Sequence, residues 1–153
     1  MTTAGAVLAV HLVSMSIFIG SITVVLLGKI YAERPENLSS ISVILGLLIF
    51  IDQRATGPSA AVLTVTGILL VPLGGWDLVR QTWLQALVVL WAGSAVAAHK
   101  LLLPRLRTLR QMAESHGASG RYRQKARQWN VVSGILLLVQ LLAITIATLK
   151  PTI

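Results

Sequence analysis

The sequence predicts an all-α integral membrane protein: an up-down bundle of four helices, with an extra interfacial helical segment before the second span. Four long stretches, residues 1–28, 55–76, 81–98 and 130–149, contain no Asp, Glu, Lys or Arg. A helix needs about 20 mostly apolar residues to cross ~30 Å of hydrocarbon, and its backbone amides must be paired within the helix because lipid offers no partners. The composition agrees, since 55% of the residues are hydrophobic and only 12% are charged.

The four spans are predicted at about residues 4–31, 55–73, 81–103 and 128–149, within a single transmembrane domain that covers residues 1–153. Prolines and glycines mark the ends, because proline disfavours helical geometry in the residue before it and glycine permits a tight turn. Short connections make successive spans antiparallel, which gives the up-down order. The boundaries follow from Arg34-Pro35, Gly57-Pro58, Gly74-Gly75, Pro104 and Pro151.

Residues 37–51 form an ambiguous segment that is apolar, rich in serine and too short to span the membrane comfortably. If this segment crossed the membrane, the charged cluster at residues 52–54 would lie on the outer side. The basic residues would then no longer be concentrated on the cytoplasmic side of the membrane. We therefore expect an interfacial helix or a tilted lead-in to the second span.

The positive charge is concentrated on one side of the predicted bundle. The net charge is +8, and eight of the thirteen basic residues lie between Lys100 and Arg127. Because short cytoplasmic loops carry an excess of Lys and Arg, the basic loop at about 104–127 is expected in the cytoplasm of an inner or plasma membrane protein, with both termini external. We expect the lipid bilayer as the partner of this charge and no nucleic acid.

An ionisable side chain at membrane depth is a functional candidate, and His11 fits that description. Ser14, Phe18 and Ser21 share its helix face, Gln85 is predicted at a similar depth, and Thr66 and Gln140 lie deeper. These residues predict a polar pocket that opens outwards, in which a neutral imidazole ligates haem iron or relays a proton. The alternative is a histidine hydrogen-bonded to a neighbouring helix, because buried polar groups find partners.

Other polar residues have simpler interpretations. His99 is expected roughly 20 Å from His11 in depth, which excludes both from one haem. The stripe at Arg127, Asn130, Ser133 and Gln140 is expected to hydrogen-bond between helices. Small-residue pairs, Ser16 with Gly20 and Gly93 with Ala97, are expected to let helices approach closely.

An ordered pattern of residues over nearly the whole chain resembles the HemJ-type proteins, a four-helix family of haem-binding protoporphyrinogen oxidases distantly related to CopD. The pattern departs from the family at Leu87, Ala97 and Val131, where that family has a lysine, a histidine and an acid, so of the implied site His11 carries over. The matching residues are His11, Phe18, Gly20 and Lys29; Pro58, Ala60, Ala61 and Gly67; Trp83-Leu84; Arg127 to Asn130; and Lys150-Pro151.

The resemblance implies an oxidoreductase with haem b held by His11 as iron ligand. We predict Phe18 and Gln85 as the other haem-binding residues, Gln85 from its depth in the third span. Without cysteine, any haem would be non-covalent. The function we predict is electron transfer, or oxidation of a porphyrin or quinol. The alternative is a non-enzymatic structural or accessory subunit of a membrane complex or homo-oligomer. A transporter or channel is disfavoured because the sequence offers no evident buried acid–base pair.

Overall fold

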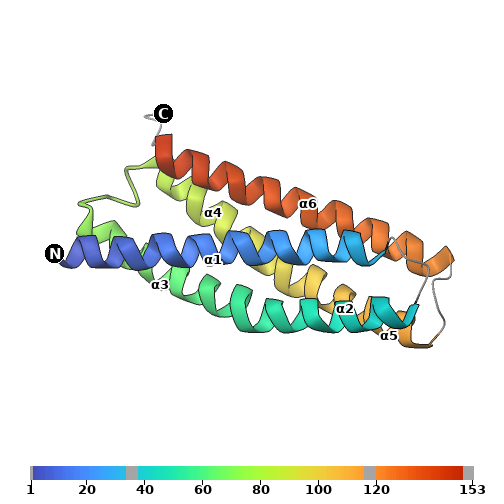
Figure 1. Ribbon diagram of the computed structural model, residues 1–153. Coiled ribbons are helices and arrows are strands. Elements are labelled where there is room, and N and C mark those ends of the chain that lie inside the picture. The colour runs from blue at the N-terminus through green and yellow to red at the C-terminus, as the bar shows by residue number, and fades with distance from the viewer. Residues whose placement is uncertain (1, 34–37, 116–119, 150–153) are drawn as a thin grey trace.

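The computed structural model describes residues 2–33, 38–115 and 120–149, and within these ranges every regular element is a helix. The chain folds into four long rods (Figure 1). Four rods are long and apolar enough to cross a membrane, at Thr3–Ala32, Ile41–Leu73, Thr82–Ser115 and Gly120–Leu149. The predicted four-helix membrane bundle is confirmed. The elements are α1 (Thr3–Ala32), α2 (Leu38–Ile51), η1 (Asp52–Thr56), α3 (Gly57–Leu73), α4 (Thr82–Ala97), η2 (Ala98–Leu102), α5 (Leu103–Ser115) and α6 (Gly120–Leu149).

The second rod is longer than the predicted span because α2, η1 and α3 follow one another without a break. Of the two expectations for residues 37–51, the lead-in to the second span is the one observed over the described residues, and a separate interfacial helix is not. The π-helical turn η1 ends two residues before Pro58, and the Gly57 N–H donates to the Asp52 carbonyl across this wide turn. A widened turn accommodates a proline that lacks an N–H and crowds the preceding turn, so the helix continues through it.

The third rod repeats this solution at Pro104. The π-helical turn η2 ends two residues before that proline, and the Leu103 N–H donates to the Ala98 carbonyl. The helix therefore continues past Pro104, the position predicted as the end of the third span. Most of the predicted loop at 104–127 is helical, in α5 and the first two turns of α6. The remaining part, 116–119, lies outside the described residues.

The hydrophobic core lies at one end of the bundle, where all four rods meet. We call this end, which contains η1, η2, α2, α5 and the start of α6, the basic end. Here α2 packs along α5, and α1 and α6 pack against them. The core residues are Val25, Leu26, Ile41, Leu45, Leu48, Ile49, Leu106, Leu109, Ala113, Tyr122, Ala126 and Trp129.

The opposite end, which we call the terminal end, holds the start of α1, the turn between α3 and α4, and the end of α6 (Figure 1). Here α1 packs along α3 and α4 packs along α6. Within the described residues, no Cα atom of α4 comes within 8 Å of α1 or α3. Aromatic side chains bridge the two pairs instead: the Phe18 and Trp91 rings are 5.2 Å apart, and Trp91 Nε1 donates to Thr64 Oγ1 at 3.0 Å.

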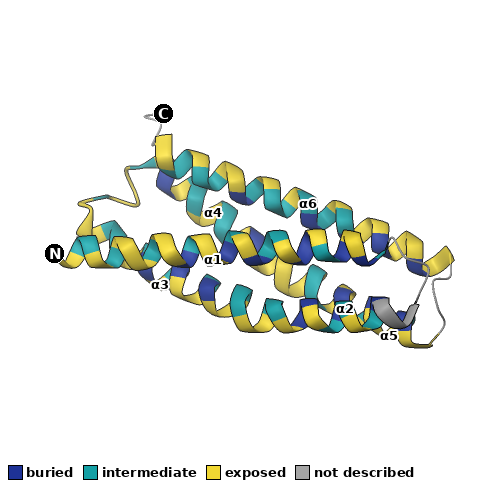
Figure 2. Ribbon diagram, viewed as in Figure 1, coloured by how far each residue is buried: buried dark blue, intermediate teal, exposed yellow. Residues whose placement is uncertain are grey.

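Exposed residues line the outward faces of the rods (Figure 2), and many of them are large hydrophobic side chains, as lipid contact requires. Val89, Ile68 and Leu138 are 70%, 66% and 66% exposed. In water such an array of exposed aliphatic side chains would be unfavourable, whereas in a bilayer it faces hydrocarbon. The fold therefore buries few residues of each span and presents the rest outward.

The small-residue pairs do not bring helices of this chain together. A Cβ built at Gly20 or Gly93 would meet nothing within 4 Å. The close approach occurs at Gly28 instead, where a Cβ would lie 2.8 Å from Leu48 Cδ2 of α2. The expectation that Gly20 and Gly93 mediate packing within the bundle is therefore wrong.

Candidate functional site

His11 is half-buried on α1 and contacts the neighbouring helix α3. Its Nδ1 lies 2.8 Å from Thr66 Oγ1, which makes a hydrogen bond between the two helices. Gly67 lies beside the imidazole, since a Cβ there would be 3.4 Å from His11 Cε1. The structure thus brings together His11 and Thr66, which were placed in one pocket from their depths.

The Thr66 hydroxyl has two further acceptors on its own helix, Val62 O at 2.7 Å and Leu63 O at 3.2 Å. The contact with His11 fits either ring tautomer. In the tautomer in which the hydroxyl donates to its own helix, it accepts from His11 Nδ1–H. In the neutral ring, Nε2 then carries the lone pair, which is the arrangement of a metal-ligating histidine whose other nitrogen is held by a hydrogen bond.

The other residues predicted for the pocket are distributed differently. Gln85 is exposed, and its Nε2 donates to the carbonyls of Leu78 and Val79 at 3.1 and 2.9 Å, so it fastens the turn between α3 and α4. Phe18 is buried at 8% exposure, two turns beyond His11 on the same helix, against Trp91. The structure gives no contact between Gln85 and His11, and haem binding by these residues stays a prediction.

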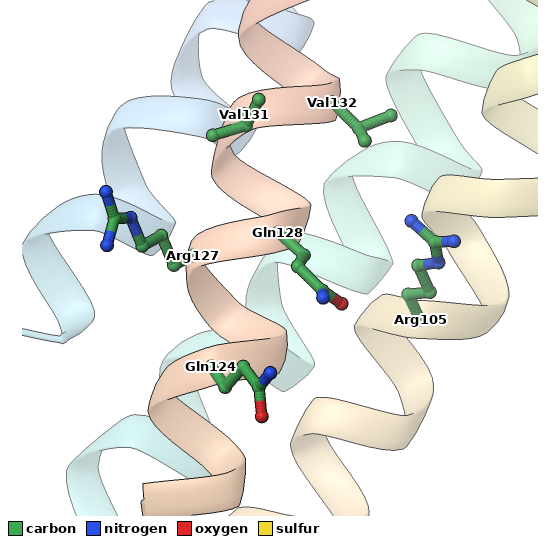
Figure 3. Close-up of a pocket in the computed structure, with 6 residues that line it drawn as sticks. All are labelled: Arg105, Gln124, Arg127, Gln128, Val131 and Val132. Carbon is green, nitrogen blue, oxygen red and sulfur yellow. The ribbon is translucent and has the colours of Figure 1, made fainter.

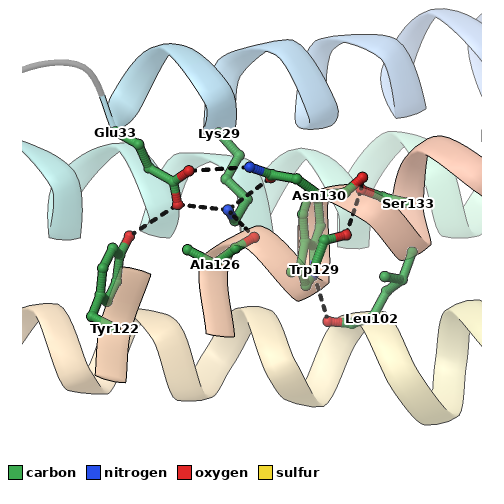
Figure 4. Close-up of polar contacts among 8 residues, drawn as sticks. All are labelled: Lys29, Glu33, Leu102, Tyr122, Ala126, Trp129, Asn130 and Ser133. Atoms are coloured by element: carbon green, nitrogen blue, oxygen red, sulfur yellow. Dashed lines mark hydrogen bonds and ion pairs between the residues drawn. The ribbon is translucent and has the colours of Figure 1, made fainter. Parts of the chain in front are cut away.

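A second cluster of polar side chains lies at the basic end and centres on Lys29, which is fully buried (Figure 4). Its Nζ donates to Glu33 Oε1 at 2.6 Å, Asn130 Oδ1 at 2.9 Å and the Ala126 carbonyl at 3.2 Å. An ammonium has three N–H donors, so every donor has an acceptor. We call Lys29, Glu33, Tyr122, Trp129 and Asn130 the lysine cluster.

The remaining members close the network between α1 and α6. Asn130 Nδ2 donates to Glu33 Oε2 at 3.2 Å, and the Tyr122 hydroxyl lies 3.5 Å from Glu33 Oε1. The Trp129 ring lies 5.0 Å from Lys29 Nζ, within cation–π range. Its Nε1 donates to the Leu102 carbonyl at the end of η2, 3.1 Å away, so the cluster links three of the four rods.

Lys29 and Glu33 form an ion pair at the end of the first span, with side chains 0% and 21% exposed. The lysine is buried, and the acid keeps contact with solvent. The sequence carried a signal in their four-residue spacing, which aligns a cation and an acid on one helix face. Asn130 was expected to hydrogen-bond between helices, and the structure supplies its partners.

The histidine at the basic end, His99, belongs neither to the His11–Thr66 site nor to the lysine cluster. His99 lies exposed in η2, and Asp52 in η1 is close enough to His99 and Arg107 to interact with them electrostatically. Among the residues that the structure describes, no three His, Asp or Glu side chains gather as a metal site would require. A metal held by several protein ligands therefore finds no support in residues 2–33, 38–115 and 120–149, whereas a haem needs as little as one.

Four apolar rods, an outward surface of aliphatic side chains and a lysine cluster that closes one end define a four-helix integral membrane protein. The comparison of sequences gives the family. The chain belongs to the predicted integral membrane proteins of the DUF2269 family, whose pattern matches residues 6–151. No curated protein and no solved structure matches the chain. The family match supports the membrane class, and the relation to HemJ-type proteins stays a prediction.

Proposed function

We propose that this protein binds one non-covalent haem b through His11 and serves electron transfer, or oxidation of a porphyrin or quinol, within the membrane. The observation that carries the proposal is the hydrogen bond between His11 Nδ1 and Thr66 Oγ1. That bond orients the imidazole and, in the tautomer with hydrogen on Nδ1, leaves Nε2 as a base, and a neutral imidazole nitrogen is a common axial ligand of haem iron.

The surroundings of His11 fit a porphyrin in two respects. Gly67 lets α3 approach the edge of the imidazole, since a Cβ there would already be in contact with Cε1 at 3.4 Å, and this contact helps to hold the orientation of the ring. At the terminal end the helix pairs are joined by side chains such as Phe18 and Trp91 rather than by close backbone contact, so a flat apolar group has less packing to displace there. When bound, the haem would supply one-electron chemistry, while the protein holds and orients it.

The same proposal includes an orientation. The basic end, with its excess of Lys and Arg, lies in the cytoplasm, and both termini lie outside an inner or plasma membrane. His11 then lies near the external side. A membrane-soluble reductant such as a quinol reaches that depth from the bilayer.

An absorption spectrum of the protein purified in detergent tests the proposal. We expect a Soret band that is lost in His11→Ala and retained in His99→Ala, which removes an exposed imidazole at the opposite end. In Thr66→Val the imidazole loses its partner, so we expect the band to persist with a changed reduction potential, because the partner of the non-ligating nitrogen tunes the metal. Colourless protein from cells supplied with haem would refute the proposal.

A second candidate is a non-enzymatic accessory or structural subunit, alone or in a homo-oligomer. The observation in its favour is that the lysine cluster satisfies all its ammonium donors within the chain, which suits a structural lock. Under this candidate, His11→Ala leaves assembly and partner capture unchanged, while substitutions in the lysine cluster weaken both. Cross-linking in membranes of the wild-type protein, of His11→Ala and of a lysine-cluster variant such as Lys29→Met distinguishes this candidate from the haem proposal.

A further inference from the structure

A shallow groove of about 430 Å³ lies between α5 and α6 at the basic end (Figure 3). Arg105 of α5 and Gln128 of α6 extend towards each other across it, and Gln124 opens onto the same space. Arg127 borders the groove at its base while its guanidinium turns to the other side of α6. The lining residues are Arg105, Gln124, Arg127, Gln128, Val131 and Val132.

The groove holds cationic and amide donors, and among the described residues no carboxylate forms an ion pair with its arginines. In the described part of the chain, the ion pairs join Lys29 to Glu33, Arg80 to Asp77 and Arg110 to Glu114. Neither Arg105 nor Arg127 takes part in one. A planar guanidinium flanked by amide N–H groups favours a phosphate or carboxylate, which accepts several hydrogen bonds at once.

The groove also lies at the depth of lipid head groups. The charge-free stretch of α6 begins at Asn130. Val131 and Val132 lie at the start of this apolar stretch, whereas Gln124 and Gln128 lie in the polar first turns of α6. One side of the groove therefore suits a charged head group and the adjoining side suits a hydrocarbon chain. Basic pockets between helices at this depth are the type of site that binds anionic lipid head groups.

We propose that this groove binds one anionic phospholipid. Its phosphate accepts hydrogen bonds from the Arg105 guanidinium and the amides of Gln124 and Gln128, and its acyl chain lies along Val131 and Val132. A free phosphate would satisfy the donors and leave the valines without a partner, so the lipid is the better match for the whole groove.

Native mass spectrometry of the detergent-purified protein tests the proposal, after incubation with phosphatidylglycerol or with phosphatidylcholine. We expect preferential retention of phosphatidylglycerol and about tenfold weaker retention in Arg105→Gln, as for the loss of a charge-assisted hydrogen bond. The matched control Arg123→Gln removes the same charge from an exposed position of α6 outside the groove. Equal losses in the two variants would overturn the proposal, because they would indicate diffuse attraction to the basic end.

A second variant removes the amides and keeps the net charge. In Gln124→Leu with Gln128→Leu, we expect weaker retention of phosphatidylglycerol than in the wild-type protein, and unchanged retention would overturn the proposal. Excess inorganic phosphate separates the two sources of a phosphate group. We expect it to leave the lipid in place because of the acyl-chain contact, and displacement would overturn the assignment to a phospholipid. Circular dichroism of each variant confirms that the helices are intact before binding is compared.

Discussion

Replacing Lys29 by methionine removes a fully buried ammonium while keeping an unbranched side chain of similar length. Three acceptors lose their donor: Glu33 Oε1, Asn130 Oδ1 and the Ala126 carbonyl. Glu33 is left as an unpaired carboxylate at the edge of the core. The variant therefore tests whether the lysine cluster holds α1 against α6.

The expected cost follows from the burial of the two partners. Removing one partner of a buried ion pair costs about 3–5 kcal/mol, because the other charge stays uncompensated. The Glu33 side chain keeps 21% of its exposure, so water partly solvates it, and Asn130 Nδ2 still donates to it. We therefore expect the lower end of that range, about 3 kcal/mol, in the free energy of unfolding.

A matched control exists in the same chain. Arg110 and Glu114 form another pair with four-residue spacing, at 2.9 Å, but their side chains are 46% and 47% exposed. Arg110→Met should cost about 0–1 kcal/mol, as exposed pairs do. The measurement is reversible unfolding in mixed micelles, followed by circular dichroism for both variants.

The reasoning also predicts the double variant. Lys29→Met combined with Glu33→Gln removes both charges, so part of the lost stability should return, since the remaining amide needs less solvation than a carboxylate. If Lys29→Met destabilises the protein no more than Arg110→Met does, the lysine cluster is not a lock and the argument from burial is refuted.

Two further predictions concern the packing of α1 and the aromatic bridge. Gly28→Ala should destabilise the bundle by about 1–2 kcal/mol, because the new methyl group would lie too close to Leu48. Gly20→Ala, with open space around it, should stabilise the bundle by up to about 1 kcal/mol through helix propensity. Thermal unfolding of both variants checks whether the two changes in stability have opposite signs. Trp91→Phe keeps a ring and loses the hydrogen bond to Thr64, so it should cost about 1 kcal/mol in the same assay. A Trp91→Phe protein as stable as the wild type would mean that this bond does not join the helix pairs.

The spans were predictable because a stretch of about twenty residues without charge indicates a helix surrounded by lipid hydrocarbon. The sequence left open whether the second span continues through Pro58 into residues 37–51, and it placed the end of the third span at Pro104, because proline is ordinarily a boundary in sequence terms. Whether a helix bends, stops or widens into a π-turn depends on the neighbours that support it. Here α2 and α5 pack along each other just beyond the two π-turns, so ending either helix at its proline would have cost that contact.

The sequence predicted how deep each candidate residue lies in the membrane, but it did not predict where each side chain points. Spacing along a helix gives the height of His11 and Thr66, and their contact follows because α1 and α3 pack directly. Gln85 has a similar predicted height, but its side chain turns to the nearby carbonyls of the connecting turn. Local backbone acceptors compete for an amide, and the sequence pattern alone does not decide that competition.

Lys29 was the least predictable residue of the bundle. A charged side chain in the last turn of a span is ordinarily expected to extend to the head groups. It is buried here because Glu33, Asn130 and Ala126 together supply an acceptor for every N–H, and two of these acceptors come from a helix about a hundred residues away. Its burial is thus a property of the assembled bundle.

The two ends of the bundle are stabilised by different means, and this difference bears on where function lies. The basic end combines the hydrophobic core with the lysine cluster, so all four rods share apolar packing and three of them also share a polar network. At the terminal end α1 packs along α3 and α4 packs along α6, while the Phe18–Trp91 ring contact and the Trp91–Thr64 hydrogen bond join the two helix pairs. Segments with fewer buried contacts open at lower free energy. If the proposed haem binds, we expect it to separate the two helix pairs at the terminal end more easily than the four rods at the basic end.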